Sequence, residues 1–219
     1  MAITHLITGF GLDKRVLECL NLPPERFRCV DLIPVEPGES MPRYALKLAE
    51  KIGFQTGDAV GGLSLGGMLA LEIAKQCDAS QVTLLSSCTH PRFIRPQFRA
   101  AGRLARWTPK IALHILFQNI PVFLRLTGMH TSKGSNFVRK VMGDFPPRLI
   151  QQFPKMILDW EGCEPSVLCR ALHCENDWLI RPPLHLPHLT LLPGKFHLTT
   201  VSRTEAVRNF LMDGSTSSP

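Results

Sequence analysis

Three residues far apart in the sequence are of the types that together activate a nucleophile. Ser64 stands in Gly62-Leu63-Ser64-Leu65-Gly66, which matches the pattern G-x-S-x-G, and Asp177 and His197 follow it in that order. A serine hydroxyl is a poor nucleophile unless a base takes its proton and a third group orients that base. The residue types and their order therefore predict Ser64 as nucleophile, His197 as base and Asp177 as acid.

The setting of Ser64 adds to the pattern itself. An apolar, glycine-rich strand is expected at 59–63, and an apolar helix is expected at 66–77. A serine on a tight turn from strand to helix projects its hydroxyl above the sheet, and the close approach of the two elements requires glycine at 62 and 66. The alternative is a glycine-rich turn that binds nothing or a phosphate, but neither G-K-[ST] nor G-x-G-x-x-G spacing is present.

The candidate acid and base follow later strands. Asp177 comes after a strand expected at 171–174, and His197 comes after one expected at 189–192. In this architecture the partners of the serine lie in loops at the carboxyl ends of later strands, in the order acid and then histidine. Glu175 competes with Asp177, but it lies closer to its strand and we expect it to be a solvated loop residue.

Two backbone N–H groups are candidates for an oxyanion hole, which stabilises negative charge on a reacting carbonyl oxygen. The N–H of Leu65 begins the helix after the serine. The N–H of Phe10, between Gly9 and Gly11, lies in the loop after the first expected strand. The alternative for that loop is an ordinary glycine turn.

The elements that must position these residues alternate along the chain. Strands are expected at 3–8, 27–33, 59–63, 82–85, 171–174 and 189–192, with helices at 12–20, 42–52, 66–77 and 200–212. This alternation predicts an α/β fold with a mostly parallel sheet and helices on both faces. From 90 to 160 the strands stop and helical segments broken by proline follow. We therefore expect a core of 1–89 and 161–212, a helical cap inserted at 90–160, and a disordered tail at 213–219.

These residues resemble the α/β-hydrolase superfamily over most of the core. The resemblance rests on Thr8-Gly9-Phe10-Gly11, the turn from Gly62 to Gly67, Asp177 with Ile180-Arg181-Pro182, and Gly194 to His197. Among its members the chain is most similar to small carboxylesterases of the pimeloyl-carrier-protein methyl ester esterase type. The chain departs from the family at Thr8, where histidine is common, and at Cys174 and Phe196, where glycine is common. The resemblance implies a shortened α/β-hydrolase fold that lacks the leading strands.

Basic residues recur every three or four positions at the start of the expected cap: Arg92, Arg95, Arg99, Arg103, Arg106 and Lys110. Such spacing places them on one helical stripe, with Phe98, Ala101, Leu104 and Ala105 on the opposite side. We expect Pro96 to begin the helix. The stripe is either a solvated face or a docking strip, formed by Arg99, Arg103 and Arg106, for an acidic partner such as an acyl carrier protein.

Composition excludes several function classes. The 219 residues carry a net charge of +7, yet the chain has no helix-turn-helix or zinc-finger spacing, so we expect no nucleic-acid partner. No run of about 18 apolar residues is present, so we expect no membrane span. The seven cysteines form no C-x-x-C pair and the start lacks a signal-peptide pattern, which favours a cytoplasmic protein with reduced thiols and no metal.

Taken together, the residues predict serine-dependent hydrolysis of a carboxylic ester through an acyl-enzyme, with a small acyl ester as substrate and no cofactor. Two alternatives remain open. One is a carrier-linked methyl ester esterase or a thioesterase that docks an acidic partner on the cap arginines. The other is a ligand-binding signalling protein of the same fold that turns over slowly.

Overall fold

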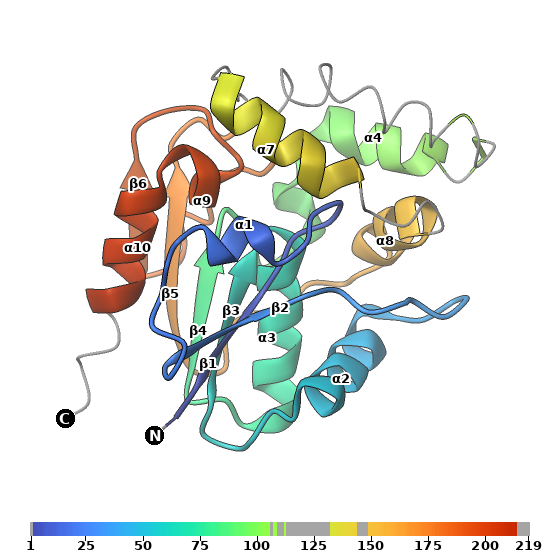
Figure 1. Cartoon of the computed structure of the whole chain (residues 1–219). Helices are drawn as coiled ribbons and strands as arrows, with labels where there is room; N and C mark the ends of the chain where they lie inside the picture. Colours follow the sequence, from blue (N-terminus) through green and yellow to red (C-terminus); the bar gives the residue numbers. More distant parts are fainter. Residues whose placement is uncertain (1, 106, 109–111, 113–131, 144–148, 214–219) are drawn as a thin grey trace.

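A single parallel sheet forms the centre of the molecule. The computed structural model describes residues 2–105, 107–108, 112, 132–143 and 149–213. Within this part of the chain the strands are β1 (Thr4–Ile7), β2 (Phe27–Val30), β3 (Ala59–Leu63), β4 (Gln81–Leu85), β5 (Leu168–Cys174) and β6 (His188–Leu192). Their order across the sheet is β2-β1-β3-β4-β5-β6, and each neighbouring pair is parallel. The carboxyl ends of all six strands therefore meet at one edge (Figure 1).

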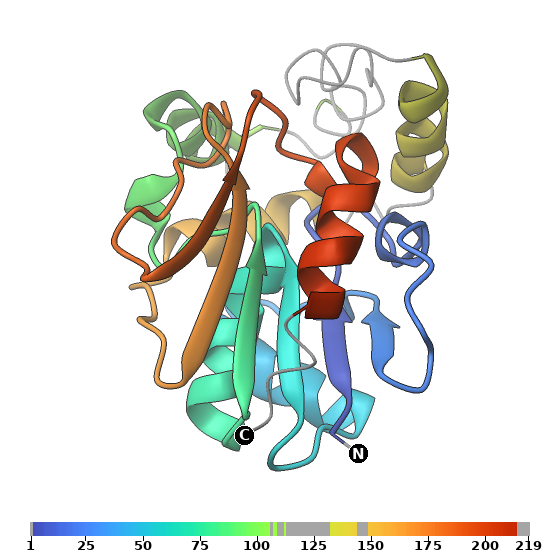
Figure 2. The ribbon, with the colours of Figure 1, turned by 90° about the vertical axis from the view of Figure 1, so that its left-hand side faces the viewer.

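Helices cover both faces of the sheet (Figures 1 and 2). One face packs against α2 (Met41–Ile52) and α3 (Leu65–Cys77), and the other packs against α1 (Arg15–Glu18), α9 (Thr199–Ser202) and α10 (Thr204–Asp213). Adjacent strand residues enter different cores: Leu84 lies in the cluster with α2 and α3, whereas Leu85 lies in the cluster with α1 and α10. Because successive strand side chains point to opposite faces, the continuous apolar runs of the inner strands β1, β3, β4 and β5 bury both faces of the sheet, whereas the edge strand β6 has no buried residue.

The segment between β4 and β5 contributes the 3-10 turn η1 (Pro91–Phe93) and the helices α4 (Pro96–Ala105), α7 (Ser132–Gly143) and α8 (Leu149–Leu158). Figure 1 shows α4 and α7 above the edge where the strands end. Val138 of α7 joins the apolar cluster with α1, and Phe153 of α8 packs edge-on against Phe10 with ring centres 6.1 Å apart. The helix α4 begins at Pro96, as the sequence predicts. The expected tail falls almost entirely on 214–219, outside the described residues.

Two helices differ from the sequence-based expectation. The helix expected at 12–20 is only α1, because the Asp13 side chain caps the N–H of Arg15 and Asn21 adopts a positive φ of 48°. The helix expected at 200–212 is split into α9 and α10 at Arg203, whose backbone (φ −138°, ψ 42°) leaves the helical region. The guanidinium of Arg203 instead donates to the Pro193 carbonyl oxygen at 3.0 Å. No helix in the described part of the chain has the length and apolarity needed to span a bilayer.

Candidate active site

Ser64 occupies a strained position between β3 and α3. Its φ of 54° and ψ of −115° lie in a region that residues with side chains rarely adopt, at a cost of about 1–3 kcal/mol. The neighbouring glycines allow the turn: a Cβ on Gly66 would lie 2.1 Å from the Ile7 carbonyl oxygen, and one on Gly62 would lie 2.4 Å from the Gly66 carbonyl carbon. The requirement for glycine at these two positions is thereby confirmed.

His197 lies between Ser64 and Asp177 at the carboxyl edge of the sheet. Its Nε2 is 2.9 Å from Ser64 Oγ, and its Nδ1 is 2.8 Å from Asp177 Oδ2. An ionised carboxylate can only accept, so Nδ1 carries the hydrogen and Nε2 is free to accept the hydrogen of the serine hydroxyl. His197 is only 3% exposed. The two distances show that the structure brings together the three residues that the sequence singles out, with His197 in contact with both Ser64 and Asp177.

The Asp177 carboxylate is fully buried and accepts hydrogen bonds on both oxygens. Oδ1 accepts the backbone N–H groups of Leu179 at 2.8 Å and Ile180 at 3.1 Å. Oδ2 faces His197 and also His173, whose Nε2 lies 3.2 Å away. Burial alone raises the pKa of a carboxyl group, but the two histidines outweigh it and hold the pKa of Asp177 well below its usual range. Asp177 is therefore ionised at neutral pH.

The acid loop is fixed from two sides. The segment after β4 forms an antiparallel bridge to it between Ile94 and Ile180, and both Nε and Nη2 of Arg95 donate to the Asp177 carbonyl oxygen at 2.9 and 2.8 Å. From the histidine loop, the Gly194 carbonyl oxygen accepts the N–H of Asn176 at 3.1 Å. Sequence reasoning missed the roles of Arg95 and His173, because their spacing to Asp177 carries no recognisable pattern.

The loop after β1 lies against the serine. A Cβ on Gly9 would lie 3.4 Å from Ser64 Cβ and 3.1 Å from the Leu63 carbonyl oxygen, so this loop passes directly beside the turn. Thr8 is buried there and donates its hydroxyl to the Asp13 carbonyl oxygen at 3.1 Å. The two residues expected to supply oxyanion N–H groups thus both lie beside the serine in the chain's path: Phe10 follows Gly9, and Leu65 follows Ser64 as the first residue of α3.

The three candidate docking arginines are not equally accessible. Arg103 is exposed, Arg99 is half-buried, and Arg106 lies outside the described residues. The apolar side expected for α4 is partly wrong: Phe98 and Ala105 pack inward, but Leu104 is 67% exposed and Ala101 is exposed as well. The side of α4 that carries Gly102 instead faces α8, where a Cβ on Gly102 would lie 2.9 Å from Leu158 Cδ1.

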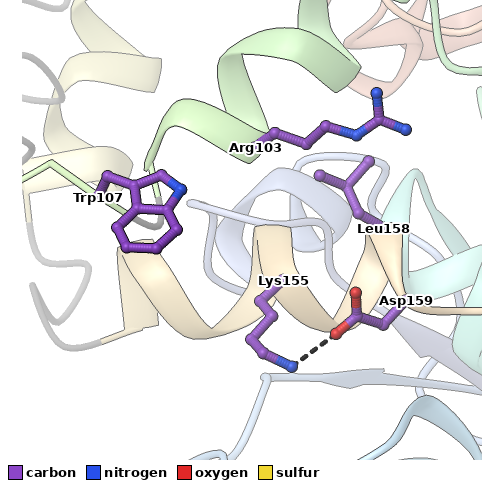
Figure 3. Close-up of a pocket in the computed structure, with 5 residues that line it drawn as sticks. All are labelled: Arg103, Trp107, Lys155, Leu158 and Asp159. Carbon is purple, nitrogen blue, oxygen red and sulfur yellow. Dashed lines mark hydrogen bonds and ion pairs between the residues drawn. The ribbon is translucent and has the colours of Figure 1, made fainter.

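A groove of about 350 Å³ runs between α4 and α8 (Figure 3). Its lining mixes apolar and charged side chains: Arg103, Trp107, Lys155, Leu158 and Asp159. Lys155 and Asp159 pair with each other across one helical turn, and Trp107 is 84% exposed. All five lining residues come from the segment between β4 and β5, and none of them belongs to the Ser64 site.

The competing residues do not occupy the site. Glu175 is exposed, as expected for a solvated loop residue. The thiols of Cys88 and Cys174 both lie near Asp177, and burial raises the pKa of each, to about 12 for Cys88, so both are protonated and poor nucleophiles. In the described part of the chain, no three His, Cys, Asp or Glu side chains are placed to hold a metal ion. The arrangement is thus suited to serine-based acyl transfer.

Comparisons with known proteins agree with this geometry at the level of the fold. The sequence matches no protein-family model and no curated protein. Among solved structures it is similar to a thermophilic esterase from Thermogutta terrifontis, with 17% identity, a TM-score of 0.74, and coverage of 98% of this chain and 89% of the other. It is also similar to an esterase from Exiguobacterium antarcticum (14% identity, TM-score 0.76, coverage 99% and 93%) and to an enol-lactonase from Burkholderia xenovorans (13% identity, TM-score 0.70, coverage 99% and 92%).

Identities this low establish architecture and not activity. The parallel sheet with helices on both faces superposes on these hydrolase structures over nearly the whole chain, with TM-scores of 0.74 and 0.76 for the two esterases. The chain has the α/β-hydrolase fold.

Proposed function

We propose that the chain hydrolyses a carboxylic ester through an acyl-enzyme formed on Ser64. The observation that carries this proposal is the unbroken contact from Ser64 Oγ to His197 Nε2 at 2.9 Å and from His197 Nδ1 to Asp177 Oδ2 at 2.8 Å. The esterases and the lactonase among the structural neighbours support the same class of reaction.

The proposed steps use these atoms in turn. Ser64 Oγ attacks the ester carbonyl carbon while its proton passes to His197 Nε2, and the negative charge of Asp177 stabilises the resulting imidazolium. The N–H groups of Leu65 and Phe10 stabilise the oxyanion of the tetrahedral intermediate. His197 then gives the proton to the leaving alcohol, and a water molecule activated by the same imidazole releases the acid. The ionised state of Asp177 at neutral pH, which its lowered pKa ensures, is the state that this cycle needs.

The test is turnover of a panel of p-nitrophenyl esters with acyl chains of increasing length. We expect hydrolysis by the wild-type chain and a loss of at least about a thousandfold in kcat for Ser64→Ala, because the variant lacks the nucleophile. Any residual rate would come from the oxyanion donors, which the variant keeps. The melting temperature should change little, which separates loss of chemistry from loss of fold. Equal rates for the two proteins would contradict the proposal, and tight binding of an ester without turnover would favour the ligand-binding alternative.

A second candidate is a methyl ester or thioester presented on an acidic carrier protein, as in the pimeloyl-carrier-protein methyl ester esterases. Exposed Arg103 and Trp107 beside the groove of Figure 3 favour it, because a basic and apolar surface suits an acidic amphipathic partner. Offering the same acyl groups free and on an acyl carrier protein distinguishes the two candidates. A preference of tenfold or more for the carrier-linked form would favour docking, and equal rates would exclude it.

A further inference from the structure

A second histidine shares the acid's oxygen with the base. His173, near the carboxyl end of β5, is 1% exposed, and its Nε2 lies 3.2 Å from Asp177 Oδ2 and 3.0 Å from the Ile180 carbonyl oxygen. His197 Nδ1 approaches the same Oδ2 at 2.8 Å. His173 belongs to β5, the strand just before Asp177, and its contact links this strand directly to the Asp177 carboxylate. The carboxylate is therefore held both by β5 and by the backbone N–H groups of its own loop.

The chemistry of the neighbours fixes the state of His173. Both groups within reach of its Nε2, a carbonyl oxygen and a carboxylate oxygen, can only accept hydrogen bonds. Nε2 must therefore carry a hydrogen, which it shares between the two oxygens. His173 cannot act as a base on this side, and its contribution to the site is a directed N–H donor.

The carboxylate of Asp177 is then saturated. A carboxylate has about four lone-pair sites, and four donors meet it: the N–H groups of Leu179 and Ile180 on Oδ1, and those of His173 and His197 on Oδ2. Because Asp177 is fully buried, rotation of its side chain would break several of these hydrogen bonds at once without solvent to replace them. The N–H of His173 also withdraws part of the negative charge that Oδ2 presents to His197.

We propose that His173 is a positioning residue for the acid: it fixes the direction in which Asp177 Oδ2 points and limits the charge that Oδ2 presents to His197. This inference rests on the proposed function, because positioning matters only if His197 acts as a base. In the described part of the chain, the titratable side chains that contact the carboxylate are the two histidines, and the guanidinium of Arg95 lies on the Asp177 carbonyl oxygen. The thiols of Cys88 and Cys174 also lie near Asp177, but burial raises the pKa of each, so both are uncharged at neutral pH. Of the two described side chains that contact the carboxylate, His197 carries the proton and His173 takes no part in its transfer.

Three variants separate positioning from stability. His173→Leu removes the donor, and His173→Gln keeps one, since a glutamine amide nitrogen reaches about as far from the backbone as imidazole Nε2. His5→Leu is the matched control, because His5 is equally buried and contacts the carboxylate of Asp58 at 3.1 Å, near the opposite edge of the sheet. In the register of the sheet His5 is level with Cys169 of β5, four residues before His173, so the control lies away from the acid in the same sheet.

We expect kcat for the best ester to fall about tenfold in His173→Leu with KM within about twofold, because a misdirected acid impairs proton transfer and not substrate binding. His173→Gln should keep kcat within about threefold of wild type. The acid limb of the kcat/KM profile should move to higher pH in His173→Leu, because the more negative carboxylate favours the protonated, inactive imidazole. His5→Leu should lower the melting temperature and leave the pH profile unchanged. Equal kcat values for His173→Leu and His173→Gln, or an unmoved acid limb, would overturn the proposal.

A readout without substrate keeps this test separate from that of the proposed function. In ¹⁵N-histidine-labelled protein, the low-field proton NMR signal of the hydrogen bond from His197 Nδ1 to Asp177 should move downfield in His173→Leu and return towards its wild-type position in His173→Gln. If the wild-type chain hydrolyses no ester, the proposed function fails while this shift still reports on His173. A signal at the same position in all three proteins would overturn the positioning role even where esters are hydrolysed.

Discussion

Replacement of Asp177 by asparagine tests how the acid controls the proton on His197. The two oxygens of Asp177 accept four N–H groups, two from the backbone at Oδ1 and two from histidines at Oδ2. An asparagine has one oxygen, which must remain opposite the backbone N–H groups of Leu179 and Ile180, because these cannot change. Its NH₂ group would then face His197 Nδ1 and force the hydrogen of the imidazole onto Nε2.

The expected cost follows from this change of tautomer. With a hydrogen on Nε2, His197 can no longer accept the proton of Ser64, whose Oγ lies 2.9 Å away. A base held in the wrong tautomer loses about ten-thousand-fold in kcat, which corresponds to about 5.4 kcal/mol in the activation free energy. We therefore expect kcat of Asp177→Asn to fall to about one ten-thousandth of the wild-type value, with KM within a few-fold.

The assay is steady-state hydrolysis of the best p-nitrophenyl ester, with ¹⁵N NMR of the imidazole to report the tautomer directly. Glu175→Gln is the matched control, because Glu175 is an exposed carboxylate in the same loop and its loss should leave kcat within about twofold. A rate for Asp177→Asn within tenfold of wild type, or equal losses in the two variants, would refute the reasoning. A large loss of rate with the hydrogen still on His197 Nδ1 would refute only the argument that the asparagine NH₂ group changes the tautomer.

Two further predictions concern the fold around the site. Gly66→Ala should lower the free energy of unfolding by at least about 3 kcal/mol, because the new Cβ would lie 2.1 Å from a backbone atom. Gly102→Ala should change the free energy of unfolding by less than about 1 kcal/mol, because its Cβ would meet only side-chain atoms such as the movable end of Leu158, and alanine favours the helix. Denaturant titration measures both values, and similar losses in the two variants would count against the close approach at the turn. Because the pKa of Asp177 is lowered in the folded chain, its ionisation stabilises the fold above about pH 4 and this stabilisation is lost as the pH falls further. The difference in unfolding free energy between wild type and Asp177→Asn should therefore shrink from pH 7 to pH 3, and a constant or growing difference would argue against the lowered pKa.

The strands β3 and β5 follow from the sequence because most of their residues are buried on both faces of the sheet, whereas the edge strand β6, which leads to His197, has no buried residue. The run Ala59–Leu63 is predicted with the bounds that it has, and the glycines of the turn identify where strand gives way to helix. Apolar periodicity overestimates helices at their ends, where a side chain intervenes: the cap by Asp13 shortens α1, and the contact from Arg203 to the Pro193 carbonyl oxygen interrupts the last helix.

Contacts between loops are the part that the sequence does not reveal. The positions of Asp177 and His197 follow from the rule that parallel strands end at one edge. The contact from Arg95 to the Asp177 carbonyl oxygen spans 82 residues, and no spacing rule connects them. The same holds for His173, which as a buried strand residue is indistinguishable in sequence from the structural histidine at position 5. The orientation of α4 also lies beyond the periodic pattern, because it is set by packing against α8, which the spacing of apolar residues within α4 does not reveal.

The central claim is that Ser64 becomes acylated by an ester substrate. The most direct measurement is mass spectrometry of the wild-type chain quenched in acid during turnover of a p-nitrophenyl ester, followed by digestion and sequencing of the peptide that contains the turn. We predict a mass increase equal to one acyl group on Ser64, absent from Ser64→Ala and strongly reduced in His197→Ala. Hydrolysis that proceeds with the acyl group on another residue, or that persists in Ser64→Ala, would contradict the account.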